Sequence, residues 1–356
     1  MTELLQRDVA LQSFNTMALP AKARWYARVE NLAGLRDALT FAQNRQLPVV
    51  VLGGGSNTLF ADDLEGLLLH IALRGTALLE DFSDSVLVRV AAGEEWDGFL
   101  RECLMRNWYG LENLALIPGT VGAAPVQNIG AYGQEVAACI EQVHILDRQT
   151  LAESTLSRAD CRFGYRSSIF QQVLRQSAVI TAVDFRLQKT FQPNLSYPAL
   201  AAAVKDIPHP TAALVRNAVI AIRTARLPDP ARLPNAGSFF RNPVVSAQRL
   251  EELRAKWPQI PSFPQAEGSV KLAAAWLIEQ SGWKGRRLGP VGMHDQQALV
   301  LVNHGGATYA DVEKLAREVS AAVFSLFAVR LEPEPVIACY SVGSREAGGA
   351  GCIYEW

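Results

Sequence analysis

The stretch LPVVVLGGGSNTLFADD, residues 47–63, places three valines just before three consecutive glycines. Valine is β-branched, and a short run of it is typical of a buried strand, which we expect at 49–51. The glycines at 53–55 tolerate positive φ and let another backbone or a ligand approach closely. Exposed backbone N–H groups in such a turn can bind an anion. The stretch therefore predicts a strand followed by a turn that is either tightly packed or binds phosphate.

Established phosphate-loop motifs do not match this turn. No GK[ST] follows the glycines, as a P-loop requires, and the Rossmann spacing G-x-G-x-x-G ends here on Thr58. By itself, a GGG run after a strand is more often a plain tight turn. A second glycine-rich segment, LIPGTVGAAPVQNIGAYGQE at 116–135, favours a ligand site. Two ordered loops that lack side chains are what a long dinucleotide needs when it lies across a domain.

Length and composition indicate a multidomain globular protein. Its 356 residues, 49% of them hydrophobic, suffice for two or three domains. A formal net charge of -1, without a long run of Lys or Arg, predicts neither a nucleic-acid nor a membrane partner. Five scattered cysteines never form CxxC, so we expect no disulfide framework and no metal site. The charged start MTELLQRDVA and the absence of a long apolar run favour a cytoplasmic protein.

Hydrophobic periodicity predicts both helices and strands. Residues 31–46 repeat leucine at helical spacing behind a possible Asn31 cap, and the alternating valines of 86–93 predict a half-buried strand. Further elements are expected at 94–107 (helix), 270–280 (helix), 298–303 (strand) and behind Thr308 (a long helix). Three prolines in 227–236 indicate a domain crossing shortly before them. The chain is thus predicted to be α+β.

Five segments together resemble one enzyme family. They are LGGGSN (52–57), IPGTVGAAPVQNIGAYG (117–133), YRSSIF (165–170), RLPDP…NAGSFFRNP (226–243) and LEPE (331–334). In this order they resemble the UDP-N-acetylenolpyruvoylglucosamine reductases, the MurB family of UDP-N-acetylmuramate dehydrogenases. The segment LSYPAL around Tyr197 resembles the type I members, which have an extra insertion that covers the substrate.

The resemblance implies an architecture. The family has an FAD-binding domain pair of the vanillyl-alcohol-oxidase (PCMH) type and a third, α+β substrate-binding domain. We expect FAD-binding subdomain 1 at 1–74, subdomain 2 at 75–215 with 328–356, and the substrate-binding domain at 216–327.

The resemblance also implies a reaction. NADPH reduces bound FAD and leaves; flavin N5 then transfers hydride to UDP-N-acetylglucosamine enolpyruvate, and a protein acid protonates the neighbouring carbon. The product, UDP-N-acetylmuramate, serves peptidoglycan synthesis and so cell wall biogenesis, cell shape and cell division. Hydride addition beside a carboxylate creates an enolate, which needs a cation, a hydrogen-bond donor and a proton source. We expect a monomer to perform this reaction.

Three residues match the family's catalytic pattern. Arg166 resembles the arginine that binds the substrate carboxylate, for which a planar guanidinium is suited. Glu334 closes the LEPE motif and resembles the acid that helps polarise the intermediate, with Glu332 as its rival. Ser238 resembles the proton donor. A serine can serve as this acid because an enolate carbon is a strong base, and Gly237 would let the substrate approach. Outside its motif, a serine after glycine is usually a turn or cap residue.

The resemblance assigns two further sets of residues. The expected cofactor-binding residues are Gly53, Gly54, Gly55, Ser56, Asn57, Gly119, Thr120, Gly122, Ala123, Gln127, Gly130, Tyr132 and Arg223. The expected substrate-binding residues are Tyr197, Arg226, Asn242, Lys284 and Gln297.

The chain departs from the family pattern at three positions. Arg226 stands where lysine is common, so a point cation becomes a planar fork. Ser167 replaces an aspartate that could support Arg166. Pro335 replaces valine and removes a backbone donor beside Glu334.

Other functions stay open at this point. An FAD-dependent alcohol or aldehyde oxidase of the same superfamily would share the fold, but no histidine that could tether flavin lies between 49 and 62. A non-catalytic flavin-binding module would need both loops but not the three catalytic residues. A zinc enzyme is poorly supported, because His294 and His304 occur without HExxH or clustered cysteines.

Overall fold

The computed structural model describes residues 4–265 and 268–338. The chain divides into two compact units. The first contains Ala23–Gly54 and Glu65–Ala225 with the N-terminal segment to Val9, and the second contains Ala10–Lys22, Gly55–Leu64 and the chain from Arg226 onward. The tail from Ser341 lies outside the described residues.

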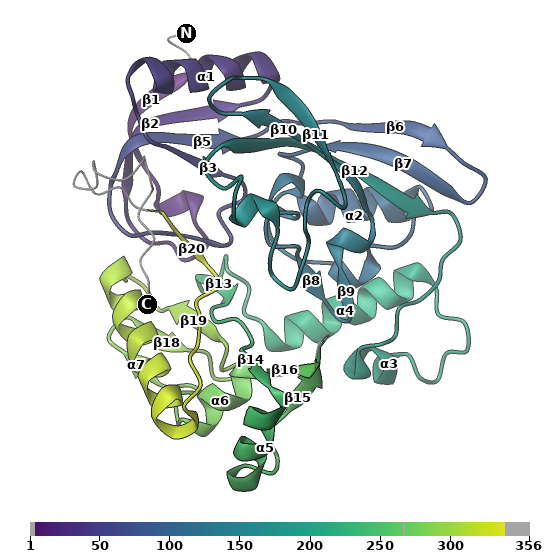
Figure 1. The fold of residues 1–356 in the computed structure, drawn as a ribbon, viewed down its shortest axis with the longest axis vertical. Helices are drawn as coiled ribbons and strands as arrows, with labels where there is room; N and C mark the ends of the chain where they lie inside the picture. Colours follow the sequence, from purple (N-terminus) through teal and green to yellow (C-terminus); the bar gives the residue numbers. More distant parts are fainter. Residues whose placement is uncertain (1–3, 266–267, 339–356) are drawn as a thin grey trace. The chain divides into compact units, whose positions relative to one another are not determined.

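The first unit begins with a four-stranded sheet of order β1-β2-β5-β3. Its strands are β1 (Leu5–Ala10), β2 (Lys22–Val29), β5 (Leu64–Ile71) and β3 (Val49–Leu52). The helix predicted at 31–46 is confirmed as α1 (Leu32–Asn44), which lies beside this sheet (Figure 1) and shares its hydrophobic core. Asn31 is its N-cap, since its Oδ1 accepts a hydrogen bond of 2.8 Å from Gly34 N.

The strand predicted from the three valines forms, but its predicted burial is wrong. β3 is the last strand of the sheet and pairs in parallel with β5 alone. An edge strand is covered on fewer sides than a central one, and the side chain of Val51 is 38% exposed.

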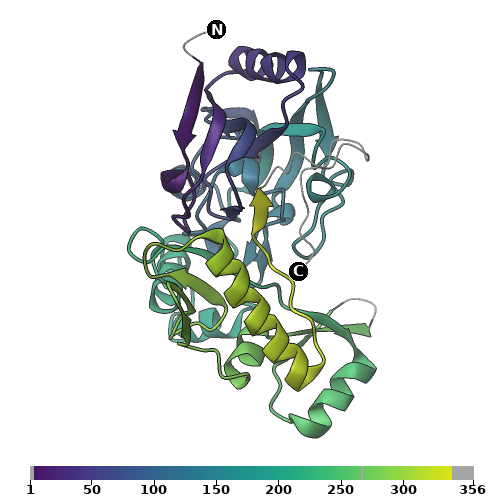
Figure 2. The same cartoon turned by 90° about the vertical axis from the view of Figure 1, so that its left-hand side faces the viewer.

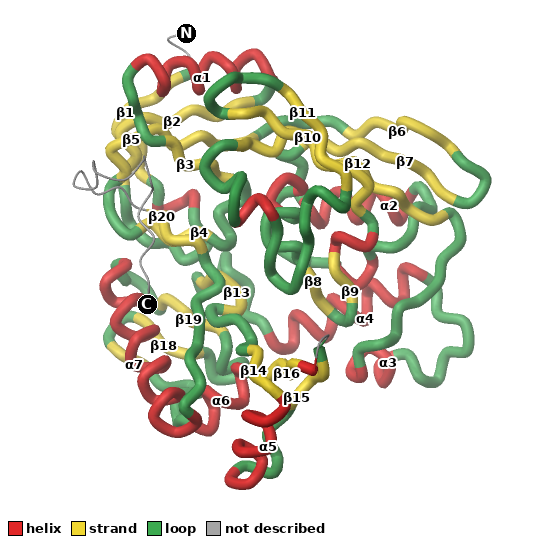
Figure 3. Tube along the Cα trace, viewed as in Figure 1, coloured by secondary structure: helices red, strands yellow, loops and turns green. Residues whose placement is uncertain are grey.

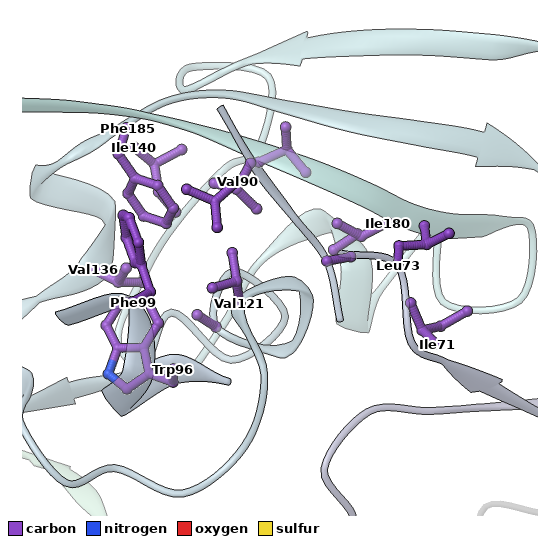
Figure 4. Close-up of a cluster of buried hydrophobic side chains, with 14 of the residues drawn as sticks. Ile71, Leu73, Val90, Trp96, Phe99, Val121, Val136, Ile140, Ile180 and Phe185 are labelled. Atoms are coloured by element: carbon purple, nitrogen blue, oxygen red, sulfur yellow. The ribbon is translucent and has the colours of Figure 1, made fainter. Parts of the chain in front are cut away.

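A five-stranded antiparallel sheet forms the rest of this unit's framework, in the order β11-β10-β12-β7-β6. Its strands are β11 (Glu153–Ser157), β10 (Ile140–Asp147), β12 (Ala178–Gln188), β7 (Ser85–Ala91) and β6 (Thr76–Asp81). The alternating valines are confirmed as the buried side of β7. The helix predicted at 94–107 is α2 (Trp96–Met105), and its Trp96 and Phe99 pack against Phe185 of β12 (Figure 4).

Smaller elements complete the first unit. They are the hairpin strands β8 (Gly130–Ala131) and β9 (Gln134–Glu135), and the helices α3 (Pro198–Ala203) and α4 (Ala212–Arg226). Between α2 and β10 the chain runs mainly as loop, as Figure 3 shows. This loop contains the second glycine-rich segment.

The described part of the second unit has three small sheets. One has the order β13-β19-β18-β17, the next β14-β16-β15, and the third pairs β20 with β4 in parallel. The strands are β4 (Thr58–Phe60), β13 (Asn235–Ser238), β14 (Val244–Ser246), β15 (Ser262–Pro264), β16 (Ser269–Leu272), β17 (Arg287–Leu288), β18 (Val291–Met293), β19 (Val300–Asn303) and β20 (Val336–Ala338). The helices are α5 (Ala247–Lys256), α6 (Ala274–Gln280) and α7 (Tyr309–Phe327).

Two helix predictions in this unit have different outcomes. The long helix behind Thr308 is confirmed as α7, which begins with a capping box between Thr308 and Asp311 and packs along the sheet that contains β18 (Figure 2). The helix predicted at 270–280 is α6, but it begins only at Ala274. Its first predicted residues belong to β16, which pairs with β14 and β15. No helix in the described part of the chain has the length and apolarity to cross a membrane.

Candidate active site

The two glycine-rich loops pack against each other in the first unit. An ideal Cβ placed on Gly54 would lie 2.8 Å from the Cα of Gly119, and one on Gly53 would lie 2.7 Å from the Thr120 Oγ1. A side chain at Gly54 would therefore push the backbone of the second loop away, and one at Gly53 would displace the Thr120 hydroxyl. Gly54 is nevertheless exposed, so this backbone contact has an open side. Such a surface is suited to a flat ligand that lies close to the main chain.

The second loop is also bound to the β7–α2 connection. The backbone N–H of Gly122 donates to Ala92 O at 2.8 Å, and a Cβ on Gly122 would lie 2.5 Å from the Ala92 Cβ. The hydroxyl of Thr120 is buried and has no hydrogen-bond partner within the described residues. A buried unpaired hydroxyl is costly, and a ligand atom could satisfy it. Both features fit a bound dinucleotide.

A β-hairpin ends this loop and presents Tyr132. β8 and β9 are joined by Tyr132 and Gly133, both with positive φ (49° and 81°), which is the pattern of a type I′ turn. The Tyr132 ring contacts the ring of Tyr197 edge to face, with 5.1 Å between centroids. Asn113 connects the hairpin to the segment before Tyr197, because its Nδ2 donates to Tyr132 O at 2.8 Å and to Asn194 O at 2.9 Å.

Two arginines lie close to this hairpin. The guanidinium of Arg223 donates a hydrogen bond to the Tyr132 hydroxyl. Burial lowers the pKa of Arg223, and the nearby positive charge of Arg166 acts in the same direction. The buried Nε of Arg223 has no partner within the described residues. Two neighbouring cations and an unpaired donor are what an anionic ligand needs.

Arg166 is presented on a tight turn. Gly164 and Ser167 exchange two backbone hydrogen bonds, of 3.0 and 3.2 Å, around Tyr165 and Arg166. Arg166 has a φ of 50°, which is uncommon for a residue other than glycine. A Cβ on Gly130 would lie 3.5 Å from Arg166 Nη1, so the guanidinium lies over the start of the hairpin. An unfavourable backbone conformation at a predicted catalytic residue supports a functional role.

Ser238 lies in the second unit, at the end of β13. Ser238 pairs with Val300 of β19, and an irregularity between Asn235 and Ser238 coincides with Gly237, whose φ is 70°. The side chain of Asn235 holds this bulge, because its Oδ1 accepts from Gly237 N at 2.9 Å. A Cβ at Gly237 would meet no atom of the described chain within 4 Å. Space therefore adjoins Ser238, as the substrate-approach hypothesis requires.

Glu334 lies on a strand-like segment beside Ser238. Its backbone N–H donates to Phe239 O at 2.8 Å, and Phe240 pairs with Pro333. Glu334 is partly buried, whereas its rival Glu332 is exposed. The Asn57 side chain donates to Glu334 O at 3.3 Å. Asn57 and the segment NAGSFFRNP thus both contact the LEPE segment within the second unit.

The predicted substrate-binding residues of this unit have separate local settings. The Oδ1 of Asn242 accepts a hydrogen bond of 2.9 Å from Ala274 N at the start of α6. Lys284 forms an exposed ion pair with Glu279 at 2.9 Å. Gln297 closes the turn before β19 by accepting from Val300 N at 3.0 Å, and Arg226 is the exposed last residue of α4. Within the described residues, no group of three His, Cys, Asp or Glu side chains could hold a metal ion.

Two residues that were not predicted from the sequence, Asn128 and Asp97, support the second glycine-rich loop and the Arg166 turn in the first unit. Asn128 is buried between the hairpin and the Arg166 turn and donates to both. Asp97 forms a buried ion pair with Arg216 and accepts from Leu116 N at 2.8 Å. Asn128 stands inside the motif VQNIGAYG, so the motif itself was a signal. No sequence signal connects Asp97 to a partner 119 positions away.

Comparison with known proteins places these features in a family context. The family model "FAD binding domain" matches residues 23–150, and "UDP-N-acetylenolpyruvoylglucosamine reductase, C-terminal domain" matches 229–338. The UDP-N-acetylenolpyruvoylglucosamine reductase of Dechloromonas aromatica is 50% identical over 92% of this chain and 98% of its own length. That of Pseudomonas aeruginosa is 48% identical over 93% and 98%.

A solved structure shares the fold. The UDP-N-acetylenolpyruvylglucosamine reductase from Thermus caldophilus superposes with a TM-score of 0.66 and covers 94% of this chain and 98% of that chain, at 23% identity. The predicted α+β architecture, with an FAD-binding part of the PCMH type and a further α+β domain, is confirmed.

Proposed function

The chain belongs to the UDP-N-acetylenolpyruvoylglucosamine reductase family, and on this premise we propose how its residues perform the reaction. It is an FAD-dependent oxidoreductase that reduces UDP-N-acetylglucosamine enolpyruvate in peptidoglycan precursor synthesis. We assign NADPH as the reductant and UDP-N-acetylmuramate as the product. The observation that carries the proposal is the bulge at Gly237, which leaves open space beside Ser238 while the LEPE segment pairs with the next residue.

FAD is assigned to the two packed glycine loops. When bound there, FAD would supply the hydride-transfer chemistry that couples oxidation of NADPH to reduction of the enolpyruvyl double bond. The close contact of Gly54 with Gly119, and the unpaired hydroxyl of Thr120, support this placement. The other residues expected at the cofactor are Gly53, Gly55, Ser56, Asn57, Gly122, Ala123, Gln127, Gly130, Tyr132 and Arg223.

Arg166 is assigned to the substrate carboxylate. Its planar guanidinium can donate two parallel hydrogen bonds to a carboxylate. When the double bond is reduced, negative charge develops on the carbon beside that carboxylate, so a fixed cation stabilises the transition state more than the ground state. Arg223 is half-buried, its buried Nε has no partner within the described residues, and it adds positive potential in the same unit.

Ser238 is assigned as the proton donor and Glu334 as its electrostatic partner. The Ser238 hydroxyl gives its proton to the carbon next to the carboxylate, and the adjoining bulge lets that carbon approach. Glu334 is held by backbone bonding to Phe239 and is less exposed than Glu332, which supports the choice between them. Phe239 and Phe240 pack in this unit's hydrophobic core and give the serine a rigid support.

The diphosphate-bearing part of the substrate is assigned to Tyr197, Arg226, Asn242, Lys284 and Gln297. We also propose the three-domain division stated above and a cytoplasmic monomer. The support for a reducing compartment is that the described cysteines, at 103, 139 and 161, are buried free thiols. Analytical ultracentrifugation would test the monomer, with a dimeric mass as the contradicting result.

Ser238→Ala tests the acid assignment. The purified protein is reduced with NADPH without oxygen and then mixed with UDP-N-acetylglucosamine enolpyruvate, while flavin absorbance is followed. We expect normal reduction and a reoxidation slowed by about 10²- to 10⁴-fold, the usual contribution of a general acid. Equal reoxidation rates in the variant and the wild type would refute the role of Ser238.

Ser246→Ala is the matched control. This serine lies in the same unit and caps α5, where its Oγ accepts from Arg249 N at 3.1 Å. Its loss costs about 1 kcal/mol of stability, as for other N-caps, but we expect both half-reactions to keep their rates. A flavin that is reduced by NADPH but never reoxidised, even in the wild type, would instead refute the substrate assignment.

A further inference from the structure

Asn128 lies at the junction of the second glycine loop, the hairpin and the Arg166 turn. Its side chain is buried, with the residue 1% exposed, and its φ is 43°. Its Nδ2 donates to Glu135 Oε2 at 2.8 Å and to Gly164 O at 3.0 Å, and its Oδ1 accepts from Ala137 N at 3.1 Å. One buried side-chain amide thus bonds both to the segment 135–137 and to Gly164 in the turn that presents Arg166.

The bond to Gly164 fixes the turn that presents Arg166. The same carbonyl accepts from Ser167 N at 3.2 Å and so closes the turn. On the far side of the turn, the Oγ of Ser168 donates to Val126 O at 2.6 Å. Both ends of the turn are therefore bonded to the short segment from Val126 to Asn128. The positive φ of Arg166 is disfavoured for arginine, so the turn needs such external support to persist.

We propose that Asn128 is a positioning residue that holds the Arg166 guanidinium in the geometry needed for the substrate carboxylate. The inference rests on the proposed role of Arg166. Asn128 reaches Arg166 through one hydrogen bond to the turn and through the hairpin, because Arg166 Nη1 lies over Gly130. A bidentate bond to a carboxylate depends on position and angle, and small displacements of a binding group lower rates strongly.

The variants separate positioning from folding. Asn128→Asp keeps the side-chain volume, tolerates positive φ and retains an oxygen for Ala137 N, but loses both donated bonds. It also sets two carboxylates side by side. Asn128→Asp combined with Glu135→Gln restores a donor–acceptor pair at 128 and 135 with reversed polarity, but not the bond to Gly164. Glu135→Gln alone is the matched control, because its amide oxygen can still accept from Asn128.

We expect the double variant to bind FAD and be reduced by NADPH at the wild-type rate. Its reoxidation by substrate should be slowed by about tenfold or more, mainly through weaker substrate binding. Glu135→Gln alone should keep both rates. Should Asn128→Asp fail to fold, Asn128→Gly, which also accepts the positive φ, gives the same comparison. Wild-type reoxidation in these Asn128 variants would overturn the inference.

Arg166→Lys is the second substitution of a double-mutant cycle with Asn128. If Asn128 acts through Arg166, adding the Asn128 substitution to Arg166→Lys should slow reoxidation no further. Additive losses would mean that Asn128 supports the site in another way, and the inference would fall. If Arg166→Lys itself reoxidised at the wild-type rate, the proposed role of Arg166 would fall instead. The cycle therefore distinguishes failure of the inference from failure of the proposed function.

Discussion

Replacing Gly54 by alanine should weaken FAD binding by a steric effect alone. The backbone of Gly54 lies outside the left-handed region, so alanine imposes no conformational strain there. Its Cβ would lie 2.8 Å from the Cα of Gly119 and 3.3 Å from the Gly119 carbonyl carbon. Carbon atoms attract each other best at about 3.5–4.0 Å, so the added methyl overlaps main chain that cannot rotate away. The second glycine loop must move.

The size of the effect follows from this overlap. Overpacking of a well-packed site costs about 1–3 kcal/mol. If the displaced loop contributes its backbone to the cofactor, that cost appears in the binding free energy, where about 1.4 kcal/mol corresponds to a factor of ten. We therefore expect an FAD dissociation constant raised by about five- to 150-fold.

Titration of the apoprotein with FAD, followed by flavin fluorescence, measures this change. Gly34→Ala is the control, because a Cβ there would make ordinary contacts, the closest being 3.5 Å from the Asn31 Oδ1. Gly34 lies in α1, so alanine should raise stability by about 0.5–1 kcal/mol and leave FAD affinity unchanged. Wild-type FAD affinity in Gly54→Ala would refute the placement of the cofactor against these loops.

Three further predictions concern buried groups. Asp97→Asn should lower the free energy of unfolding by about 3–5 kcal/mol in urea titrations, because it leaves Arg216 charged and buried; an unchanged midpoint would contradict this. Burial lowers the pKa of His70, so the unfolded imidazole binds protons more readily and stability should fall as the pH drops below about 6.5; an NMR titration midpoint at or above that value would exclude this. Burial raises the pKa values of Cys139 and Cys161 to about 12, so iodoacetamide at pH 8 should label them only after denaturation, as mass spectrometry can show.

The elements that sequence reasoning located are those with local causes. The helix behind Asn31 and the long helix behind Thr308 begin at caps that are visible in the sequence, and both form with those caps. The run that starts at Val270 has no cap and a short apolar pattern, which a strand and a helix share. Its pairing with β14 and β15 decides that its first residues form β16, and partners distant in the chain cannot be derived from local periodicity.

The candidate site was predictable to a similar extent. Sequence motifs located the residues proposed to act on the substrate, such as Arg166 and Ser238, because these side chains stand at fixed positions within their motifs. They did not reveal the contacts that hold those residues. The hydrogen bond from Asn128 to Gly164 and the one between Arg223 of α4 and Tyr132 join segments far apart in sequence. These contacts follow from how the chain folds, and only the structure shows them.

The proline after Glu334 illustrates how a departure from a family pattern can be accommodated. Proline removes a backbone donor, so Pro335 could have displaced Glu334. The backbone N–H groups on either side of Pro335 are the ones that donate hydrogen bonds. Glu334 N donates to Phe239 O and Val336 N donates to Asn57 O, both at 2.8 Å. Because these bonds flank position 335, the segment stays joined to both motifs without a donor there. Pro335→Val should therefore leave reoxidation by substrate unchanged, whereas a large change in its rate would show that the proline itself sets the position of Glu334.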